Sequence, residues 1–278
     1  MAEPTLRTMT REDVALATGL AADEGWNPGL SDAGCFHAAD SDGFFAAEVD
    51  GRIVATLSAV RYDDGFGFVG LYIVNPEFRG RGYGMTLWRH GLARLDGCVT
   101  GLDAVPAQVA TYRKSGFVPA YRSARMAGLG GGPMPGGVVR LDAVPFADVA
   151  RYDRLCFPAG REPFLQAWLS APGVSALGVM DGGILAGYGV IRPCVSGHKI
   201  GPLFANDQRV AGTLLSALAA AVPGQTFFLD VIEPNPAAVE LARSRDMTEV
   251  FTTMRMYRGG QPTTNTNRIF GVTTFDLG

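Results

Sequence analysis

The chain has 278 residues, of which 47% are hydrophobic and 18% are charged, and its formal net charge is −3. This length predicts about two domains, each large enough to bury a core of its own. The net charge is small, the arginines are spread along the chain and no basic tract of five residues occurs, so the composition argues against a nucleic-acid-binding protein.

Cysteines and histidines give no sign of a metal site. The four cysteines and three histidines lack the paired spacing of zinc ligands, so we predict no metal and free thiols. Residues 1–10 lack the apolar core of a signal peptide, and the longest apolar helical stretch, residues 211–222, is too short to cross a bilayer. We therefore expect a soluble cytoplasmic protein without a membrane partner.

A glycine- and proline-rich segment, residues 127–137, divides the chain. Its six glycines and two prolines disfavour both a helix and a central strand. The sequence thus predicts a first domain over 1–126, this linker, a second domain over 138–258 and a C-terminal tail over 259–278. The tail is rich in β-forming residues between 269 and 275, and we expect a terminal strand or a clamp there, with a partner that the sequence does not indicate.

The two halves of the chain resemble each other at an offset of 130 residues. Residues 116–126 match 246–256, and both segments end in Arg-Met. Further matches, in order, are 102–103 with 232–233, 106–107 with 236–237, Arg79-x-x-Gly82 with Arg209-x-x-Gly212 and, with one residue of slip, 50–55 with 181–186. Such an ordered set indicates a duplicated domain.

The first copy starts with antiparallel strands and continues with alternating strands and helices. An Asp50-Gly51 turn predicts a hairpin, because glycine adopts the positive φ that such turns need. The predicted elements are strands over 43–49, 52–61 and 66–74, a helix over 84–95, a strand over 99–102 and a helix over 107–115.

A glycine-rich loop at residues 79–84 follows the third strand directly and opens a helix. Its N–H groups and the helix N-terminus favour an anion, and its glycines let a pyrophosphate approach closely. No Gly-Lys-Ser/Thr follows, which excludes a Walker loop, and the antiparallel strands before the loop argue against a Rossmann fold. A tight turn without a ligand explains the same glycines, so the loop alone leaves both interpretations open.

Two motifs resemble those of a known family. Val74-x-Pro-x-x-Arg79-Gly-x-Gly82-x-Gly84 resembles motif A of the GNAT superfamily of N-acyltransferases, and Tyr112-x-x-x-Gly-Phe resembles its closing signature. The resemblance is specific over residues 5–126, and the repeat extends it to about residue 257. The chain is similar to the tandem subgroup, in which an active acetyltransferase domain precedes a diverged GNAT-like domain.

The resemblance implies an α+β (mixed α/β) fold of two GNAT-like domains. Each would have a mixed, mostly antiparallel, splayed central sheet flanked by helices. It also implies acetyl-CoA as the cosubstrate. A splayed strand would pair with the pantetheine arm, the glycine loop would hold the pyrophosphate, and the cofactor-binding residues would be Tyr72, Ile73, Val74, Arg79, Gly80, Arg81, Gly82, Tyr83 and Gly84.

Some positions depart from the family pattern. Val105 and Gln108 stand where the superfamily commonly has Asn and Ala, which removes one side-chain contact to the cofactor arm. In the second copy Leu214 replaces Gly84, so we expect only the first copy to bind acetyl-CoA.

The resemblance also assigns catalytic residues. Tyr112 falls where many family members place a general acid, and a phenol with a pKa near 10 keeps its proton at neutral pH. Packing of the Tyr112 ring on the sheet is the alternative. Asp103, at the end of a strand, is the first candidate for a general base, although capping of the next helix explains it as well. Asp32, Glu24 or a chain of water molecules stay open as the base.

The acceptor site is expected upstream of the first sheet and at the second domain. Trp26 and Asn27 lie in a turn-rich segment where the fold places its substrate-binding helices, and they either shape the pocket or anchor the turn. In the second copy Ala242 replaces Tyr112, and Glu233 stands at the position of Asp103. We therefore expect the second domain to be structural and to shape the substrate site, with Glu233 contributing to it.

The sequence thus predicts an acetyl-CoA-dependent N-acetyltransferase that acetylates a primary amine of a small molecule by direct attack. A non-catalytic acyl-CoA-binding sensor or interaction module is the alternative from another class. The acceptor, the acyl-chain preference and the oligomeric state are left open.

Overall fold

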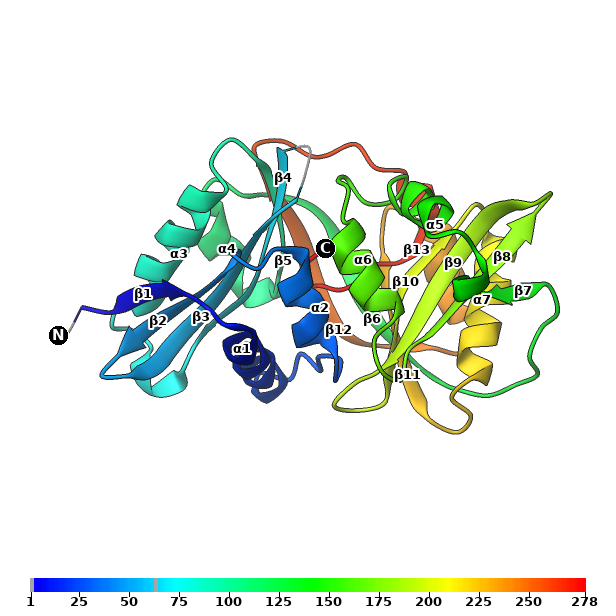
Figure 1. Cartoon of the computed structure of the whole chain (residues 1–278), viewed down its shortest axis with the longest axis horizontal. Coiled ribbons are helices and arrows are strands. Elements are labelled where there is room, and N and C mark those ends of the chain that lie inside the picture. The colour runs from blue at the N-terminus through cyan, green and yellow to red at the C-terminus, as the bar shows by residue number, and fades with distance from the viewer. Residues whose placement is uncertain (1–2, 63–64) are drawn as a thin grey trace.

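The computed structural model describes residues 3–62 and 65–278 and is built around one large sheet (Figure 1). Within these residues the sheet has 13 strands in the order β1-β2-β3-β4-β5-β12-β6-β11-β10-β9-β8-β7, and β13 pairs with β10 beside this path. The strands are β1 (Thr5–Thr8), β2 (Phe44–Val49), β3 (Arg52–Arg61), β4 (Phe66–Val74), β5 (Val99–Ala104), β6 (Val118–Leu129), β7 (Val138–Arg140), β8 (Ser175–Asp181), β9 (Ile184–Pro193), β10 (His198–Ala205), β11 (Thr226–Ile232), β12 (Thr248–Arg258) and β13 (Ile269–Gly271).

Eight α-helices within the described residues flank this sheet. They are α1 (Arg11–Asp23), α2 (Asp32–Ala39), α3 (Tyr83–Arg94), α4 (Val109–Arg113), α5 (Phe146–Asp153), α6 (Glu162–Leu169), α7 (Gln208–Ala220) and α8 (Pro236–Arg243). The mixed fold with a mostly antiparallel sheet confirms the predicted fold class. None of the helices described is long and apolar enough to span a membrane.

The elements predicted for the first copy are present with small shifts at their ends. β2 and β3 form the predicted hairpin, and Asp50 in its turn has a φ of 51°. β4 pairs antiparallel with β3 and parallel with β5, and α3 follows β4 after the glycine loop. The helix predicted over 107–115 is shorter, because a 3-10 turn (Pro106–Gln108) precedes α4.

The two halves exchange their last strands. β6 closes the first half of the chain, yet it pairs with β11 and β12 of the second half. β12 in turn pairs with β5 of the first half, and Figure 1 shows it in the middle of the molecule. Each half therefore supplies the strand that completes the sheet of the other half.

The glycine-rich segment between the halves starts later than expected. β6 continues to Leu129. Residues 127–129 pair with β11 on one side, and Ala127 also pairs with β12 on the other. The expectation that residues 127–137 exclude a central strand was wrong for these three, because β11 and β12 offer partners that sequence does not show. The division of the chain into two domains stays a prediction.

The internal repeat has a structural counterpart at the ends of α4 and α8. The N–H group of Phe117 donates to the carbonyl of Tyr112 at 3.3 Å, and that of Met247 donates to the carbonyl of Ala242 at 3.2 Å. Gly116 and Asp246, which precede these donors, both have positive φ, 85° and 56°. The 130-residue offset thus relates two copies of the same local structure.

Candidate active site

β4 and β5 part at the centre of the first half. Their parallel pairing runs from Phe66↔Val99 to Val69↔Leu102 and then ends. Leu71, just beyond this point, has a φ of 45°, and the register between β3 and β4 shifts beside it. The later residues of β4, including the predicted Tyr72, Ile73 and Val74, therefore line a V-shaped gap, as expected for a splayed sheet.

The glycine loop lies at the end of β4 and presents free N–H groups. Gly80 and Gly82 have φ of 78° and 87°, and a Cβ on either would meet no atom within 4 Å. In the part of the chain that the structure describes, no protein acceptor takes a hydrogen bond from the backbone N–H groups of residues 80–85. Together with the N-terminus of α3, these donors form a site that suits a phosphate group.

Arginine side chains hold the loop in place. The Arg79 guanidinium donates to the carbonyl of Val74 at 2.9 Å and forms an ion pair with Glu24. Arg81 donates to the carbonyl of Glu77 at 2.9 Å. Glu24, one of the open candidates for a general base, is therefore already paired with an arginine of the loop.

Gly84 has a role different from the one expected. A Cβ at this position would lie 2.6 Å from Cγ2 of Val74 and 2.7 Å from the Tyr72 hydroxyl. The third glycine therefore lets α3 pack directly on β4, while Gly80 and Gly82 leave open space for a ligand. Tyr83 is buried, so at this end of the loop only backbone groups are offered to a ligand.

A pocket lies where β4 and β5 part, at the narrow end of the gap. Four predicted site residues line it, namely Trp26, Tyr72, Asp103 and Tyr112. The others that bear polar or aromatic groups were not predicted: Arg125 from β6, Phe251 and Thr253 from β12, and Phe275 and Asp276 from the tail. The exchanged strands and the tail thus complete a pocket that starts in the first half.

The Tyr112 ring packs in an aromatic cluster beside the pocket. Its centroid lies 5.1 Å from that of Trp88 and 6.4 Å from that of Phe117. Burial raises the pKa of the Tyr112 phenol, with a further contribution from Tyr72. The ring is thus fixed by packing, and the hydroxyl keeps its proton at neutral pH, as a general acid requires.

Asp103 is bound by an arginine of the second half. Its carboxylate accepts hydrogen bonds from Arg255 at 3.1 and 2.7 Å and from Thr253 at 3.3 Å, and its side chain is fully buried. It caps no helix in the described chain, so that alternative was wrong. A buried pair of this kind holds β5 to β12, which leaves Asp103 poorly placed to take a proton from a substrate.

The same arrangement recurs between β6 and β11. Arg125, which matches Arg255 in the repeat, donates to Asp230 at 2.7 and 2.8 Å. Arg255 and Asp103 face each other in the register of β12 and β5, as Arg125 and Asp230 do in β6 and β11. The counterpart of Asp103 is therefore Asp230, and the assignment of Glu233 to that position was wrong.

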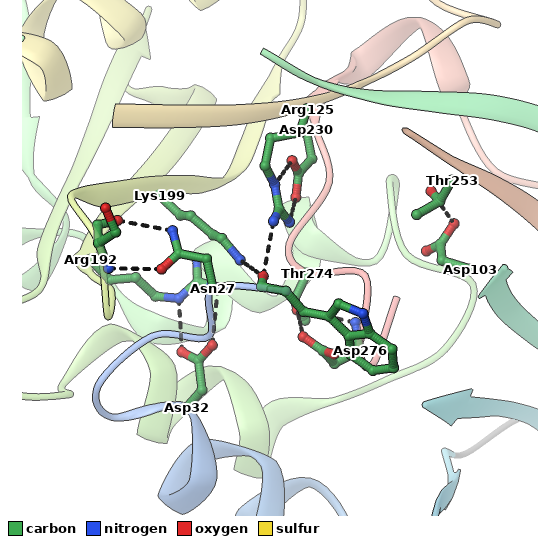
Figure 2. A network of polar contacts seen from close by, with 12 residues as sticks. Asn27, Asp32, Asp103, Arg125, Arg192, Lys199, Asp230, Thr253, Thr274 and Asp276 are labelled. Carbon is green, nitrogen blue, oxygen red and sulfur yellow. Dashed lines mark hydrogen bonds and ion pairs between the residues drawn. The ribbon is translucent and has the colours of Figure 1, made fainter. Parts of the chain in front are cut away.

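The segment with Trp26 and Asn27 is fastened to the second half (Figure 2). The Trp26 carbonyl accepts hydrogen bonds from Arg125 at 3.0 Å and from Lys199 at 3.1 Å. Asn27 exchanges two hydrogen bonds with the backbone of Ser196, at 2.9 and 2.8 Å. Trp26 thus lines the pocket on a fixed backbone, whereas Asn27 anchors the turn and is not among the residues found to line the pocket.

The remaining carboxylates named from sequence lie outside the pocket or are paired. Asp32 accepts hydrogen bonds from Arg192 at 2.8 and 3.2 Å and is buried. Glu233 lies in a separate groove beside α8, where its partly exposed carboxylate faces Arg122. Asp276 is the pocket carboxylate that sequence reasoning missed, and only the β-rich character of the tail hinted at its importance.

Comparisons with known proteins identify the family. Residues 10–117 match the model of the acetyltransferase (GNAT) family, and residues 149–271 match that of an acetyltransferase (GNAT) domain. A holothin acyltransferase from Pseudoalteromonas sp. (strain SANK 73390) is 30% identical over 277 residues, which span 99% of this chain and 94% of the relative. The chain belongs to the GNAT family. It is an N-acyltransferase with two GNAT domains in tandem.

Solved structures share the fold over nearly the whole chain. A putative acetyltransferase from Pyrococcus horikoshii has a TM-score of 0.85 at 24% identity, covering 100% of this chain and 97% of that one. A tandem GNAT protein from the clavulanic acid biosynthesis pathway has a TM-score of 0.63 at 14% identity, covering 94% of this chain and 100% of that one. At these identities the likeness concerns the fold.

Proposed function

We propose that this protein is an acetyl-CoA-dependent N-acetyltransferase that acetylates a primary amine of a small molecule by direct attack. The observation that carries the proposal is the gap between β4 and β5, which has free N–H donors of residues 80–85 at one end and the Tyr112 pocket at the other. Membership of the GNAT family supports acetyl-CoA as the acyl donor.

The residues of the gap fit an acyl-CoA. The loop N–H groups and the α3 N-terminus would hold the pyrophosphate, and the unpaired edge of β4 beyond Val69 would bind the pantetheine arm. When bound there, acetyl-CoA supplies an acetyl thioester to the pocket. Tyr112 would give its proton to the departing sulfur, since its raised pKa keeps the phenol protonated.

Pocket chemistry indicates the class of acceptor. Trp26, Phe251 and Phe275 give the pocket aromatic walls. Two ion pairs lie at the pocket, and in each the arginine charge is neutralised by an aspartate: Arg125 binds Asp230 and Arg255 binds Asp103. No lining cation is thus left to bind an acceptor carboxylate among the described residues. We infer a flat, largely apolar amine without a carboxylate, and the relative named for holothin supports a small-molecule acceptor.

Thiol release from acetyl-CoA across a panel of amines tests this proposal. Flat amines without a carboxylate should release thiol in equal amount to an N-acetylated product seen by mass spectrometry. Matched amines that carry a carboxylate should react more slowly. Binding of acetyl-CoA without turnover on any amine would instead favour the acyl-CoA sensor.

A further inference from the structure

The C-terminal tail fills the gap in the second half that corresponds to the proposed cofactor gap in the first. β10 and β11 pair only from His198↔Phe227 to Ile200↔Leu229. Beyond that point β13 pairs with β10, at Leu203↔Gly271 and Phe204↔Ile269, and the N–H group of Val272 donates to the carbonyl of Asp230 at 2.9 Å. The tail therefore has a fixed starting point between β10 and β11.

From β13 the tail runs to the first half and lies against β4. The Tyr62 hydroxyl donates to the carbonyl of Leu277 at 3.0 Å. A Cβ on Gly70 would lie only 2.0 Å from the carbonyl oxygen of Asp276. Gly70 precedes Leu71, where β4 leaves β5, so the tail backbone touches β4 at the narrow end of the gap, beside the pocket.

Asp276 differs from the other carboxylates of this region in its partners. Asp32 and Asp230 bind Arg192 and Arg125, as Figure 2 shows, and Asp103 binds Arg255. Asp276 lines the pocket with Tyr112 and accepts a side-chain hydrogen bond from Thr274 at 2.9 Å, and it forms no ion pair within the described residues. It is a pocket carboxylate held in position by Thr274 and, unlike the other three, not bound to an arginine in the described chain.

We propose that Asp276 is the general base of the reaction, so that a residue delivered by the second half accepts the proton of the acceptor amine. This inference rests on the proposed acetyl transfer. The amine nitrogen attacks the thioester carbonyl carbon, the C–N bond forms and the C–S bond breaks. Asp276 takes the proton lost by nitrogen, and Tyr112 gives a proton to sulfur. Proton return from Asp276 to the Tyr112 oxygen through solvent restores both groups, and an acceptor that arrives as ammonium releases one further proton to solvent.

The surroundings of Asp276 suit this role. Burial raises its pKa above the ordinary 3.8, and Asp32 acts in the same direction, while Lys199, Thr274 and Arg125 oppose the shift. A higher pKa makes the ionised carboxylate a stronger base than an exposed aspartate. Because the base must be ionised, activity should rise with pH as Asp276 loses its proton, at a pH above 3.8.

The Asp276→Asn variant tests the assignment. We expect kcat to fall roughly 10²- to 10⁴-fold with an unchanged KM for acetyl-CoA and without the acidic limb of the pH profile. Asp276→Glu should recover part of the rate. Asp142→Asn, at an exposed carboxylate outside the pocket lining, is the matched control and should behave as wild type.

Thermal stability separates catalysis from a structural role. An ionised carboxylate with a raised pKa costs folding free energy, so Asp276→Asn should melt no lower than wild type near neutral pH. A wild-type kcat and an intact acidic limb of the pH profile in Asp276→Asn would overturn the assignment of Asp276 as the base and leave the proposed function standing. So would a rate loss explained by a lower melting temperature or by weaker acetyl-CoA binding. A wild-type protein that acetylates no amine would overturn the proposed function, and the role of Asp276 with it.

Discussion

Tyr112 combines a packed ring with a hydroxyl that forms no hydrogen bond to a protein group in the described chain. Tyr112→Phe should therefore keep the contacts with Trp88 and Phe117 and remove only the proton donor. We expect kcat to fall roughly 10²- to 10⁴-fold, with little change in the melting temperature or in acetyl-CoA affinity, measured by steady-state kinetics and calorimetry.

The pH dependence of Tyr112 follows from its burial. Its pKa lies above the ordinary value of 10, so the phenol should stay protonated and cause no loss of rate between pH 7 and 10. Wild-type turnover in Tyr112→Phe would reduce Tyr112 to a packing residue.

The two repeated arginines could be recognised from the sequence, but the aspartates that they bind could not be assigned correctly. The repeated Arg-Met ending of 116–126 and 246–256 was visible, and both arginines prove to hold a buried aspartate. Glu233 was expected at the position of Asp103, but the strand pairing places Asp230 opposite Arg125, as Asp103 lies opposite Arg255. A fixed offset fails where one copy has extra residues between strand and helix, and sequence comparison alone does not locate them.

Elements with a local signal were predictable, and those that depend on distant partners were not. The Asp50-Gly51 hairpin, β4, the glycine loop and α3 follow from turn residues and from local hydrophobic spacing. The exchange of β6 and β12 does not follow from the sequence. The alternation of side chains predicts a strand, but it does not indicate which strand pairs with it. The pocket residues that were missed come from those exchanged strands and from the tail.

The contact between the tail and β4 gives a prediction at the level of elements. Gly70→Ala would place a methyl group 2.0 Å from the Asp276 carbonyl oxygen, so the tail must move away from β4. Overpacking of this kind costs about 1–3 kcal/mol. We expect a lower kcat and faster hydrogen exchange in residues 272–278, measured by mass spectrometry.

Gly136→Ala is the control, because its Cβ would meet no atom within 4 Å. Unchanged exchange and unchanged kcat in Gly70→Ala would show that the tail is not held by this contact.

The whole molecule should unfold as one unit. The sheet is continuous across the halves, and the buried pairs Arg255–Asp103, Arg125–Asp230 and Arg192–Asp32 link segments of both. Circular dichroism and tryptophan fluorescence should therefore report the same thermal transition, and the calorimetric and van't Hoff enthalpies should agree. Two separated transitions would mean that the halves fold independently despite the exchanged strands.

Duplication has left one open site and one closed site. In the first half, α3 starts after Gly82, and no protein acceptor among residues 3–62 and 65–278 binds the first N–H groups of this helix. In the second half, α7 starts soon after β10, the Asp207 carboxylate accepts from the N–H group of Val210 at 2.8 Å, and β13 fills the gap. Leu214 lies inside α7 and packs in the core, so the closure arises from the earlier start of the helix and from the tail rather than from the replacement of Gly84 by Leu214.

Calorimetric titration of the full chain with acetyl-CoA tests this central claim most directly. The account predicts one site per chain in the wild type. Gly82→Asn keeps a side chain that tolerates the positive φ of 87° and adds no charge, whereas Gly82→Asp places a carboxylate at the proposed phosphate site. Binding to Gly82→Asp should be at least about tenfold weaker than to Gly82→Asn, a difference of about 1.4 kcal/mol. Two sites of similar affinity, or equal binding by the two variants, would contradict it.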